Sequence, residues 1–172
     1  MIIRAETPKD YKIIYEVNEK AFENNSESKL IDKIRTSENY IPELSLVALK
    51  EKEIVGHILF SKLKIVNEKG GVEVLSLAPM CVLPEYQNQG IGSELVEKGL
   101  RISKDLDYNI IIIVGHPNYY PRFGFTPARE KGLEVSLKME IPDEAFMVCE
   151  LEKDTLKDVT GIVEYPAYFE GN

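Results

Sequence analysis

Two glycines, Gly90 and Gly92, stand between an apolar run that predicts a strand and a segment with helical periodicity. Glycine lets the backbone adopt positive φ angles and approach a ligand closely, because it has no Cβ atom. The first N–H groups of a helix have no partner within the helix, and the helix dipole adds partial positive charge there. Pyrophosphate is the natural ligand of such a segment, but on two glycines alone a tight turn without a ligand is the favoured interpretation.

Two other glycine motifs are excluded at this position. A Walker loop needs Lys followed by Ser or Thr after its second glycine, whereas Gly92 is followed by Ser93 and Glu94. The dinucleotide fingerprint needs a third glycine three residues further on, where this chain has Leu95. Neither nucleotide-binding loop is predicted.

The wider segment from Leu83 to Gly92, LPEYQNQGIG, resembles motif A of the GNAT N-acetyltransferase superfamily, Q/R-x-x-G-x-G/A. In that superfamily the loop holds the pyrophosphate of CoA, so the resemblance implies acetyl-CoA as co-substrate. The implied loop contacts are Gln87, Asn88, Gln89, Gly90, Ile91, Gly92 and Ser93. The backbone of Met80, Cys81 and Val82 would pair with pantetheine, at a fourth strand that splays from the fifth. Pro79 fits such a break, because proline cannot donate to a strand ladder.

An aromatic segment, residues 119–125, follows a buried apolar run. The resemblance implies that Tyr120, four residues before Gly124, lies near the CoA sulfur and protonates the departing thiolate, which makes it the one predicted catalytic residue. The alternative is that Tyr119 and Tyr120 are core aromatics with a hydroxyl bonded to the backbone. For Tyr119 we favour that packing role.

No general base is assigned. An ammonium acceptor must lose a proton, and its solution pKa is about 10. Some GNAT enzymes place a glutamate six residues before the position of Val82, where this chain has Ser76. Glu73 has the right chemistry at a different position. Glu27 is another candidate, but a solvated carboxylate is the preferred interpretation, and a water chain is a further alternative.

The remaining reactive side chains are few. His57 is interpreted as a strand histidine with a satisfied ring, and His116 as a polar loop residue. Cys81 and Cys149 sit in apolar runs, which predicts two buried thiols rather than a disulfide. With two histidines and two such cysteines, no metal site is predicted.

The apolar periodicity predicts the elements that position these residues. They are a strand at Ile2–Ile3, a helix from Thr7 to Ala21, an amphipathic stretch around residues 30–34, a hairpin of residues 44–49 and 54–66, a long strand at 72–83, a helix at 92–105, a strand at 110–114 buried on both faces, and strands at 133–139 and 145–151. This order indicates an α/β sheet of mixed direction. The resemblance specifies the GNAT fold, with a mixed, mostly antiparallel central sheet flanked by helices and splayed between its fourth and fifth strands. One domain over residues 1–172 is expected.

Composition limits the partners. The net charge of −8, from 21 basic and 29 acidic residues, argues against nucleic-acid binding. An acidic surface is compatible with cationic amines, although it more often serves only solubility. The longest purely apolar run, residues 110–114, is far too short to cross a bilayer, and residues 1–10 contain no stretch of signal-peptide type. No membrane partner and a cytoplasmic location are expected.

Further segments are similar to the YhbS-like branch of the superfamily, namely residues 45–48, 54–61, 142–147 and the tail around 161–165. The resemblance implies an acyltransferase that moves an acetyl group from acetyl-CoA to a primary amine by direct attack in a ternary complex. The acceptor is a small molecule or a peptide, and a homodimer is compatible with the family. The alternatives are a non-catalytic sensor that binds CoA thioesters, and an interaction module whose glycine turn is only structural.

Overall fold

The computed structural model describes residues 1–171, which divide into two compact units. The first unit comprises residues 1–61, 77–102 and 171, and the second comprises residues 62–76 and 103–170. Two long strands, β3 (Glu53–Asn67) and β4 (Gly70–Val82), pass through both units. The expectation of one domain over residues 1–172 stays a prediction.

The first unit is built from four strands and three α-helices. It holds β1 (Ile2–Ala5), α1 (Tyr11–Phe22), α2 (Ser26–Arg35), β2 (Tyr40–Lys50), the beginning of β3, the end of β4 and most of α3 (Ile91–Asp105), with the 3-10 turns η1 (Pro8–Asp10) and η2 (Pro84–Tyr86). The strand order is β1-β2-β3-β4. Strand β2 pairs antiparallel with both β1 and β3.

The hairpin between β2 and β3 has a two-residue loop, Glu51 and Lys52, as its charged sequence predicts. Both residues have positive φ, 52° and 70°, which is the backbone of the turns whose twist matches that of the flanking strands. Strand β2 begins four residues earlier than the predicted Leu44, at Tyr40. The sequence prediction missed this start because Pro42 and Glu43 interrupt the apolar pattern there.

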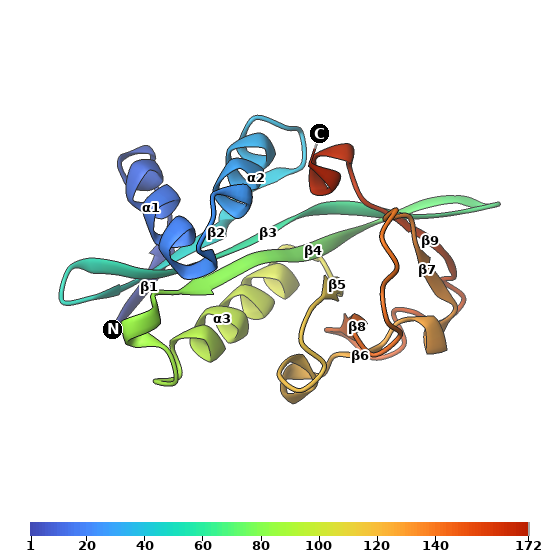
Figure 1. The fold of residues 1–172 in the computed structure, drawn as a ribbon. Coiled ribbons are helices and arrows are strands. Elements are labelled where there is room, and N and C mark those ends of the chain that lie inside the picture. The colour runs from blue at the N-terminus through green and yellow to red at the C-terminus, as the bar shows by residue number, and fades with distance from the viewer. Residues whose placement is uncertain (172) are drawn as a thin grey trace. The chain divides into compact units, whose positions relative to one another are not determined.

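The helices of the first unit cover both faces of its strands. Helices α1 and α2 lie on one face and α3 lies on the other (Figure 1). Ile14 of α1 and Ile34 of α2 are fully buried, as their helical spacing predicts. On the opposite face, Gly99 of α3 lies directly against the ring of Phe60, leaving no room for a Cβ atom. This close contact seats α3 on β3.

The second unit is mainly β-structure. It contains β5 (Ile110–Val114), β6 (Thr126–Pro127), β7 (Leu133–Val135), β8 (Phe146–Glu150) and β9 (Gly161–Glu164), with the short 3-10 helices η3 (Tyr120–Phe123), η4 (Arg129–Lys131) and η5 (Ala167–Glu170). Strand β5 pairs parallel with β4 and antiparallel with β8, while β9 pairs antiparallel with β3 and parallel with β7. Its buried core includes Ile65, Ile112, Phe146 and Val163. The predicted fold class is confirmed: the pairing is mixed and mostly antiparallel, and helices flank the strands.

One strand prediction in this unit needs correction, and two further strands lie outside the predictions. The strand expected at residues 133–139 ends at Val135, because the N–H of Lys138 donates to the carboxylate of Glu170 at 2.6 Å instead of joining a ladder. Strands β6 and β9 were not predicted. Strand β9 has four residues, of which only Val163 is buried, so its sequence carries little strand signal.

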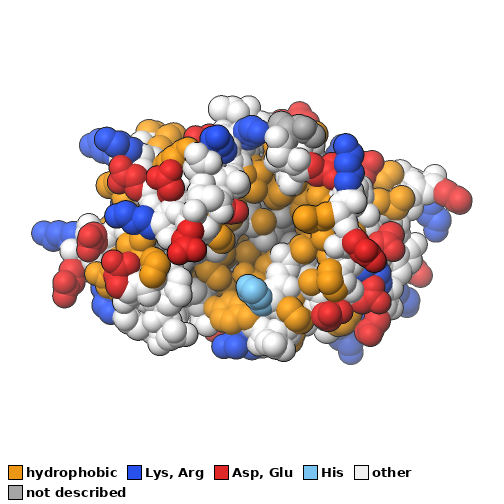
Figure 2. Space-filling model, viewed as in Figure 1, with side chains coloured by type: hydrophobic (Ala, Val, Ile, Leu, Met, Phe, Trp, Pro, Cys, Tyr) orange, Lys and Arg blue, Asp and Glu red, His pale blue; other side chains and the backbone are white. Residues whose placement is uncertain are grey.

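The length and charge of the helices show whether any of them could span a membrane. No described helix is long and apolar enough to span a membrane. The longest, α3, has 15 residues and carries charged side chains such as Glu94 and Lys104. Acidic and basic side chains are intermingled on the face drawn in Figure 2.

Candidate active site

The predicted phosphate loop lies between η2 and α3, in the first unit. Asn88 and Gly90 both have left-handed backbones, with φ of 63° and 83°. A Cβ atom added at Gly90 would meet no atom within 4 Å, so the backbone there is open to a ligand. The first hydrogen bond of the helix runs from the N–H of Glu94 to the carbonyl of Gly90, at 3.1 Å. The N–H groups of Ile91 and Gly92 precede this bond and are available to an anion.

The side chains of the loop hold it in place. Gln87 donates from Nε2 to the carbonyl of Val82 at 3.0 Å, which ties the loop to the end of β4. Gln89 accepts a hydrogen bond at Oε1 from Lys50 Nζ, at 2.9 Å. Sequence reasoning missed Lys50, because it lies 39 positions away from its partner. Its ammonium group brings positive charge to a loop whose expected ligand is anionic.

The end of β4 carries the predicted pantetheine contacts, Met80, Cys81 and Val82. The ladder between β4 and β5 pairs Leu75 and Ser76 of β4, and the described register goes no further along that strand. The predicted Pro79 follows this ladder, and its peptide bond to Ala78 is cis. The ladder thus stops short of the end of β4, as a splayed fourth strand requires.

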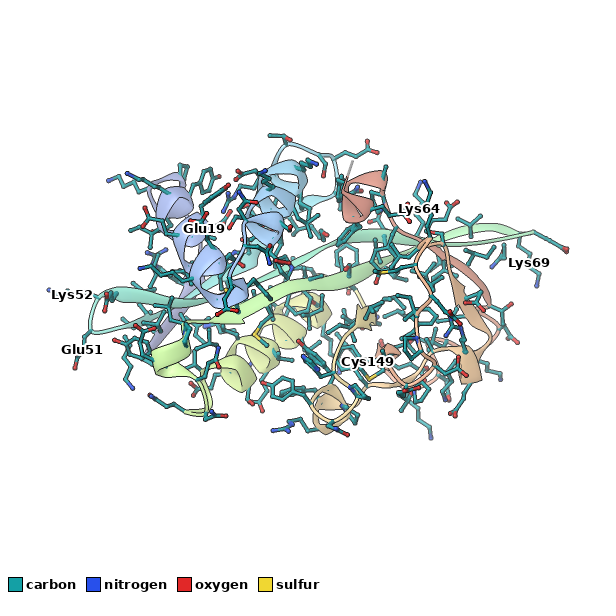
Figure 3. All side chains as sticks on the ribbon, in the orientation of Figure 1. Glu19, Glu51, Lys52, Lys64, Lys69 and Cys149 are labelled. Atoms are coloured by element: carbon teal, nitrogen blue, oxygen red, sulfur yellow. The ribbon has the colours of Figure 1, made fainter. Side chains whose placement is uncertain are left out.

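Both cysteines are buried free thiols, as predicted. Burial raises the pKa of Cys81 to about 12 and that of Cys149 to about 11. Cys149 lies in β8 of the second unit (Figure 3). A thiol that stays protonated is a poor nucleophile, so neither cysteine suits a covalent mechanism.

The predicted acid, Tyr120, belongs to the second unit and is 7% exposed. Its ring packs edge-on against Tyr119 and Phe125, with centroids 5.0 and 5.8 Å away. A Cβ atom at Gly115 would come within 2.8 Å of this ring. Tyr120 begins a 3-10 helix of four residues rather than ending an α-helix, because Pro121 follows it directly.

The hydroxyl of Tyr120 carries its proton at neutral pH. Burial raises its pKa, and the neighbouring Tyr119 adds to the shift.

Ser76 and the two candidate bases, Glu73 and Glu27, have different surroundings. Ser76 is fully buried, and its Oγ has no hydrogen-bond partner among the described residues. Glu73 is exposed, and its Oε1 accepts a hydrogen bond from the hydroxyl of Tyr108 at 2.9 Å. Glu27 differs from the expected solvated carboxylate: its Oε1 is shielded from solvent and bonds to no described group.

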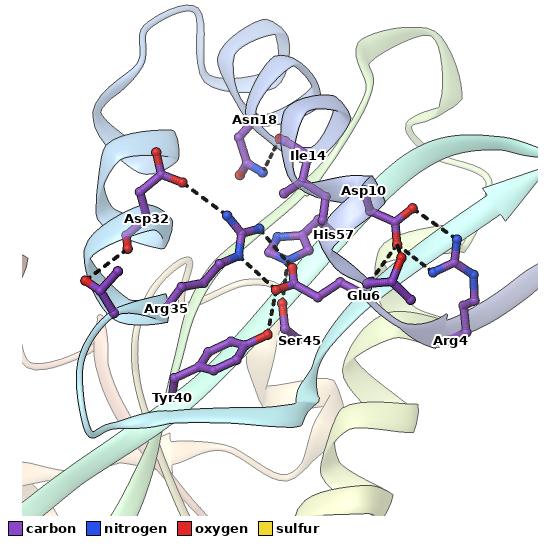
Figure 4. A network of polar contacts seen from close by, with 12 residues as sticks. Arg4, Glu6, Asp10, Ile14, Asn18, Asp32, Arg35, Tyr40, Ser45 and His57 are labelled. Carbon is purple, nitrogen blue, oxygen red and sulfur yellow. Dashed lines mark hydrogen bonds and ion pairs between the residues drawn. The ribbon is translucent and has the colours of Figure 1, made fainter.

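A buried polar network in the first unit was not predicted at all (Figure 4). Arg35 donates to both carboxylate oxygens of Glu6, at 2.8 and 2.9 Å, and the Tyr40 hydroxyl donates to the same carboxylate at 2.6 Å. The side chains of Glu6 and Arg35 are 0% and 8% exposed. These residues join the segment just after β1 to α2 and β2, and their separations of 29 and 34 positions explain why no sequence pattern indicated them.

His57 closes the network from β3. Its Nε2 lies 2.9 Å from the hydroxyl of Ser45 and 3.5 Å from Glu6 Oε1, while Nδ1 has no partner among the described residues. Burial lowers the pKa of His57, although Glu6 opposes the shift, so the ring stays neutral. For Glu6, burial alone would raise the pKa, but hydrogen bonds from Arg35, His57 and Tyr40 outweigh it and hold the pKa well below its usual range. The ring belongs to this network. The expectation that its nitrogens have hydrogen-bond partners is met for Nε2 and, among the described residues, not for Nδ1.

Two further expectations concern His116 and the metal ligands. His116 is exposed in the loop after β5. Among residues 1–171, no group of three or more His, Cys, Asp or Glu side chains is arranged to hold a metal ion.

Comparison with known proteins gives one consistent result. The sequence model of the acetyltransferase (GNAT) family matches residues 11–125. The chain is 32% identical to the uncharacterized N-acetyltransferase YhbS of Escherichia coli K12, over 170 residues and 98% of both chains. It is also 37% identical to the uncharacterized N-acetyltransferase YjhQ of the same strain, over 72% of this chain and 68% of YjhQ.

Two solved structures are similar over nearly the whole chain. The crystal structure of E. coli YhbS in complex with CoA superimposes with a TM-score of 0.89 and 30% identity, covering 98% of this chain and 91% of YhbS. A GNAT acetyltransferase from Brucella melitensis in complex with acetyl-CoA gives a TM-score of 0.79 and 29% identity, covering 98% and 97%.

Proposed function

The chain belongs to the GNAT family of acetyltransferases, and on that premise we propose that it transfers the acetyl group of acetyl-CoA to a primary amine by direct attack in a ternary complex. The observation that carries the proposal is the open loop at Gly90, with helix-start N–H groups beside it, in a chain whose similar structures hold CoA or acetyl-CoA. The loop fits an anionic pyrophosphate because its backbone is accessible and Lys50 adds positive charge.

Each part of the site has a task in this proposal. The backbone of residues 87–93 holds the pyrophosphate, while the backbone of Met80, Cys81 and Val82 pairs with pantetheine. An N–H group near Val82 polarises the thioester carbonyl. The side chains of Gln87 and Gln89 act by fixing the loop, as their hydrogen bonds indicate.

Tyr120 is proposed to protonate the departing sulfur. The phenol carries its proton at neutral pH, so a proton is present when the thiolate forms. The Tyr120→Phe variant keeps the ring and removes only the hydroxyl. We expect it to lose turnover while acetyl-CoA affinity is unchanged; full turnover in this variant would rule the role out.

The first experiment measures the unfolding temperature with acetyl-CoA and with an equal concentration of NADH. A ligand of the native state stabilises it by about 2.7 kcal/mol at a hundredfold excess over its dissociation constant. For a chain of this size that corresponds to a rise of roughly 5–10 °C. A rise with acetyl-CoA alone supports the proposal, and no rise at millimolar concentration contradicts it.

The second experiment detects thiol release from acetyl-CoA in the presence of amines. Suitable probes are spermidine, an aminoglycoside, L-lysine, and a peptide with a free N-terminus and one lysine. Small-molecule and peptide acceptors are both compatible with the proposal, and a cytoplasmic location would supply acetyl-CoA. The excess of 29 acidic over 21 basic residues favours the approach of a cationic amine.

A second candidate function is a non-catalytic sensor of CoA thioesters. It is favoured by one observation, that Ser76 stands where some GNAT enzymes carry a glutamate base. A sensor would show the temperature shift with acetyl-CoA but release no thiol with any amine.

A further inference from the structure

The proposed transfer needs a group that takes a proton from the acceptor. A primary amine is an ammonium ion at neutral pH, since its pKa is about 10, and only the neutral form attacks a thioester. Ser76 cannot serve directly, because its hydroxyl is not a base. Glu73 is exposed and bonded to Tyr108, and His57 is held in the buried network. A base on another element of the chain, or a water chain, has to take this proton.

Glu27, the second residue of α2, has a carboxylate oxygen that lacks a hydrogen-bond donor among the described residues, as expected of a base that takes its donor from the substrate. Its Oε1 is shielded from solvent, yet it accepts no hydrogen bond from any described group. A carboxylate oxygen that is removed from water and left without a partner is costly to the folded protein. An ammonium group that donates a hydrogen bond to this oxygen would remove the cost. The acceptor amine of the proposed reaction, in its ammonium form, is such a donor.

The position of Glu27 is fixed by its own helix. Next to it, the Ser28 hydroxyl donates to the carbonyl of Tyr15 at 2.7 Å, which ties the start of α2 to α1. At the other end of α2, Arg35 makes its paired hydrogen bonds to Glu6. A catalytic side chain on an element held at both ends is better positioned than one on a mobile loop.

Glu27 also acts electrostatically on the strand end that is proposed to bind the thioester. The pKa of Cys81 is raised first by burial and further by the negative charge of Glu27, so the carboxylate acts on this thiol. Cys81 immediately precedes Val82, whose neighbouring N–H is proposed to polarise the carbonyl. Both Glu27 and Cys81 belong to the first unit. The carboxylate is therefore on the same unit as the proposed seat of the reacting carbon.

We propose that Glu27 binds the acceptor as its ammonium ion and then accepts its proton. This role rests on the proposed function. One proton passes from the ammonium nitrogen to the Glu27 carboxylate, and the amine lone pair forms the C–N bond to the thioester carbon. The C–S bond breaks, the sulfur takes a proton from Tyr120, and the nitrogen loses its second proton to water. Tyr120 regains a proton from water and Glu27 releases one, so the sum is an amide, free CoA and one proton.

The experiment compares wild type with Glu27→Gln and with a matched control, Glu19→Gln. Glu19 lies on α1 and is exposed (Figure 3), so its replacement makes the same change in charge without touching the site. Thiol release from acetyl-CoA is measured with the four amine probes between pH 6.5 and 9.5. The temperature shift with acetyl-CoA is measured on all three proteins.

We expect Glu27→Gln to lower kcat/KM by about a hundredfold near neutral pH, the usual range for losing a general base. The loss should shrink about tenfold per pH unit towards the pKa of the amine, because solution then supplies the neutral form. Acetyl-CoA should shift the unfolding temperature as in wild type. Glu27→Gln should unfold no earlier than wild type, since it removes the charge from a side chain whose Oε1 is shielded and has no described partner. Glu27→Asp, which withdraws the acid by one methylene, should retain part of the rate.

Other results overturn the proposal in distinguishable ways. Full activity in Glu27→Gln, with acetyl-CoA still bound, would overturn the role of Glu27 and leave the proposed function standing. An equal loss in Glu19→Gln would assign the effect to net charge. If wild type bound acetyl-CoA but released thiol with no amine, the transfer itself would fail, and the role of Glu27 with it.

Discussion

Replacing Arg35 by methionine would test whether the buried network stabilises the first unit. Methionine keeps an apolar side chain where the guanidinium lies 3.9 Å from the centroid of the Tyr11 ring. It removes both hydrogen bonds to Glu6, whose side chain is 0% exposed. The carboxylate would remain buried with the Tyr40 hydroxyl and the more distant His57 as its partners.

The expected loss follows from what the carboxylate keeps. Removing one member of a buried ion pair costs about 3–5 kcal/mol, because the other charge stays buried without compensation. The 2.6 Å hydrogen bond from Tyr40 satisfies part of the charge, so we expect the lower half of this range, about 3–4 kcal/mol. Replacing Glu6 by glutamine in the same chain removes the buried charge, so the double variant should be more stable than Arg35→Met alone.

The chain contains a matched control for this experiment. Arg4 donates to Asp10 at 2.7 and 3.2 Å, but its side chain is 39% exposed. The side chain of Asp10 is 10% exposed but keeps hydrogen bonds from the N–H and the hydroxyl of Thr7, so Arg4→Met should cost less than Arg35→Met. Urea unfolding at pH 7 gives the midpoint and slope for each variant. Equal losses for Arg35→Met and Arg4→Met would refute the argument from burial.

The pH dependence gives a second test of the same variant. The folded pKa of Glu6 is depressed, so its contribution to stability is present above the ordinary carboxyl pKa of about 4.3 and is lost as pH falls through the folded value. Arg35→Met no longer has this contribution. The difference between wild type and variant should therefore narrow from pH 7 towards acid. A difference independent of pH would show that the lost packing, not the charge, caused the effect.

Three other variants test separate features of the structure. The pKa of His57 is lowered in the folded protein, so wild type should lose stability as pH falls below about 6.5. His57→Gln should lose less stability over the same range, as measured by the unfolding temperature between pH 8 and 5.5. Gly99→Ala should lower the free energy of unfolding by about 1–3 kcal/mol, since its Cβ would overlap the buried Phe60 ring; a stability gain, as at an exposed helix position, would contradict the packing. Gly90→Ala should cost about 1–2 kcal/mol for its left-handed backbone and should weaken the temperature shift with acetyl-CoA, whereas an unchanged shift would move the phosphate site elsewhere.

The local parts of the candidate site could be predicted from sequence. The loop from Gln87 to Gly92 lies between a strand and a helix, as its glycines and the following periodicity indicate, and the helix begins within one residue of the predicted Gly92. Such features depend on neighbours in the chain. The backbone needs of a turn and the capping of a helix are expressed within a few residues.

The features that sequence did not reveal depend on distant partners. Glu27 looked like a solvated surface residue, because one turn of helix does not tell which side a neighbouring strand will cover. Its shielded oxygen arises only when α2 packs in the folded unit. The ion pair of Glu6 and Arg35 also forms only when distant segments pack together. The same holds for β9, which is a strand because it pairs with β3 and β7.

The burial of Cys81 has a consequence for an enzyme that handles a reactive thioester. A thiolate at this position could capture the acetyl group itself or form a mixed disulfide with the CoA product. Because burial keeps the thiol protonated, with a pKa raised to about 12, both side reactions are suppressed without removing the sulfur from the strand. In the proposed function, the protein is thus chemically inert towards the thioester at a residue whose backbone would bind its pantetheine.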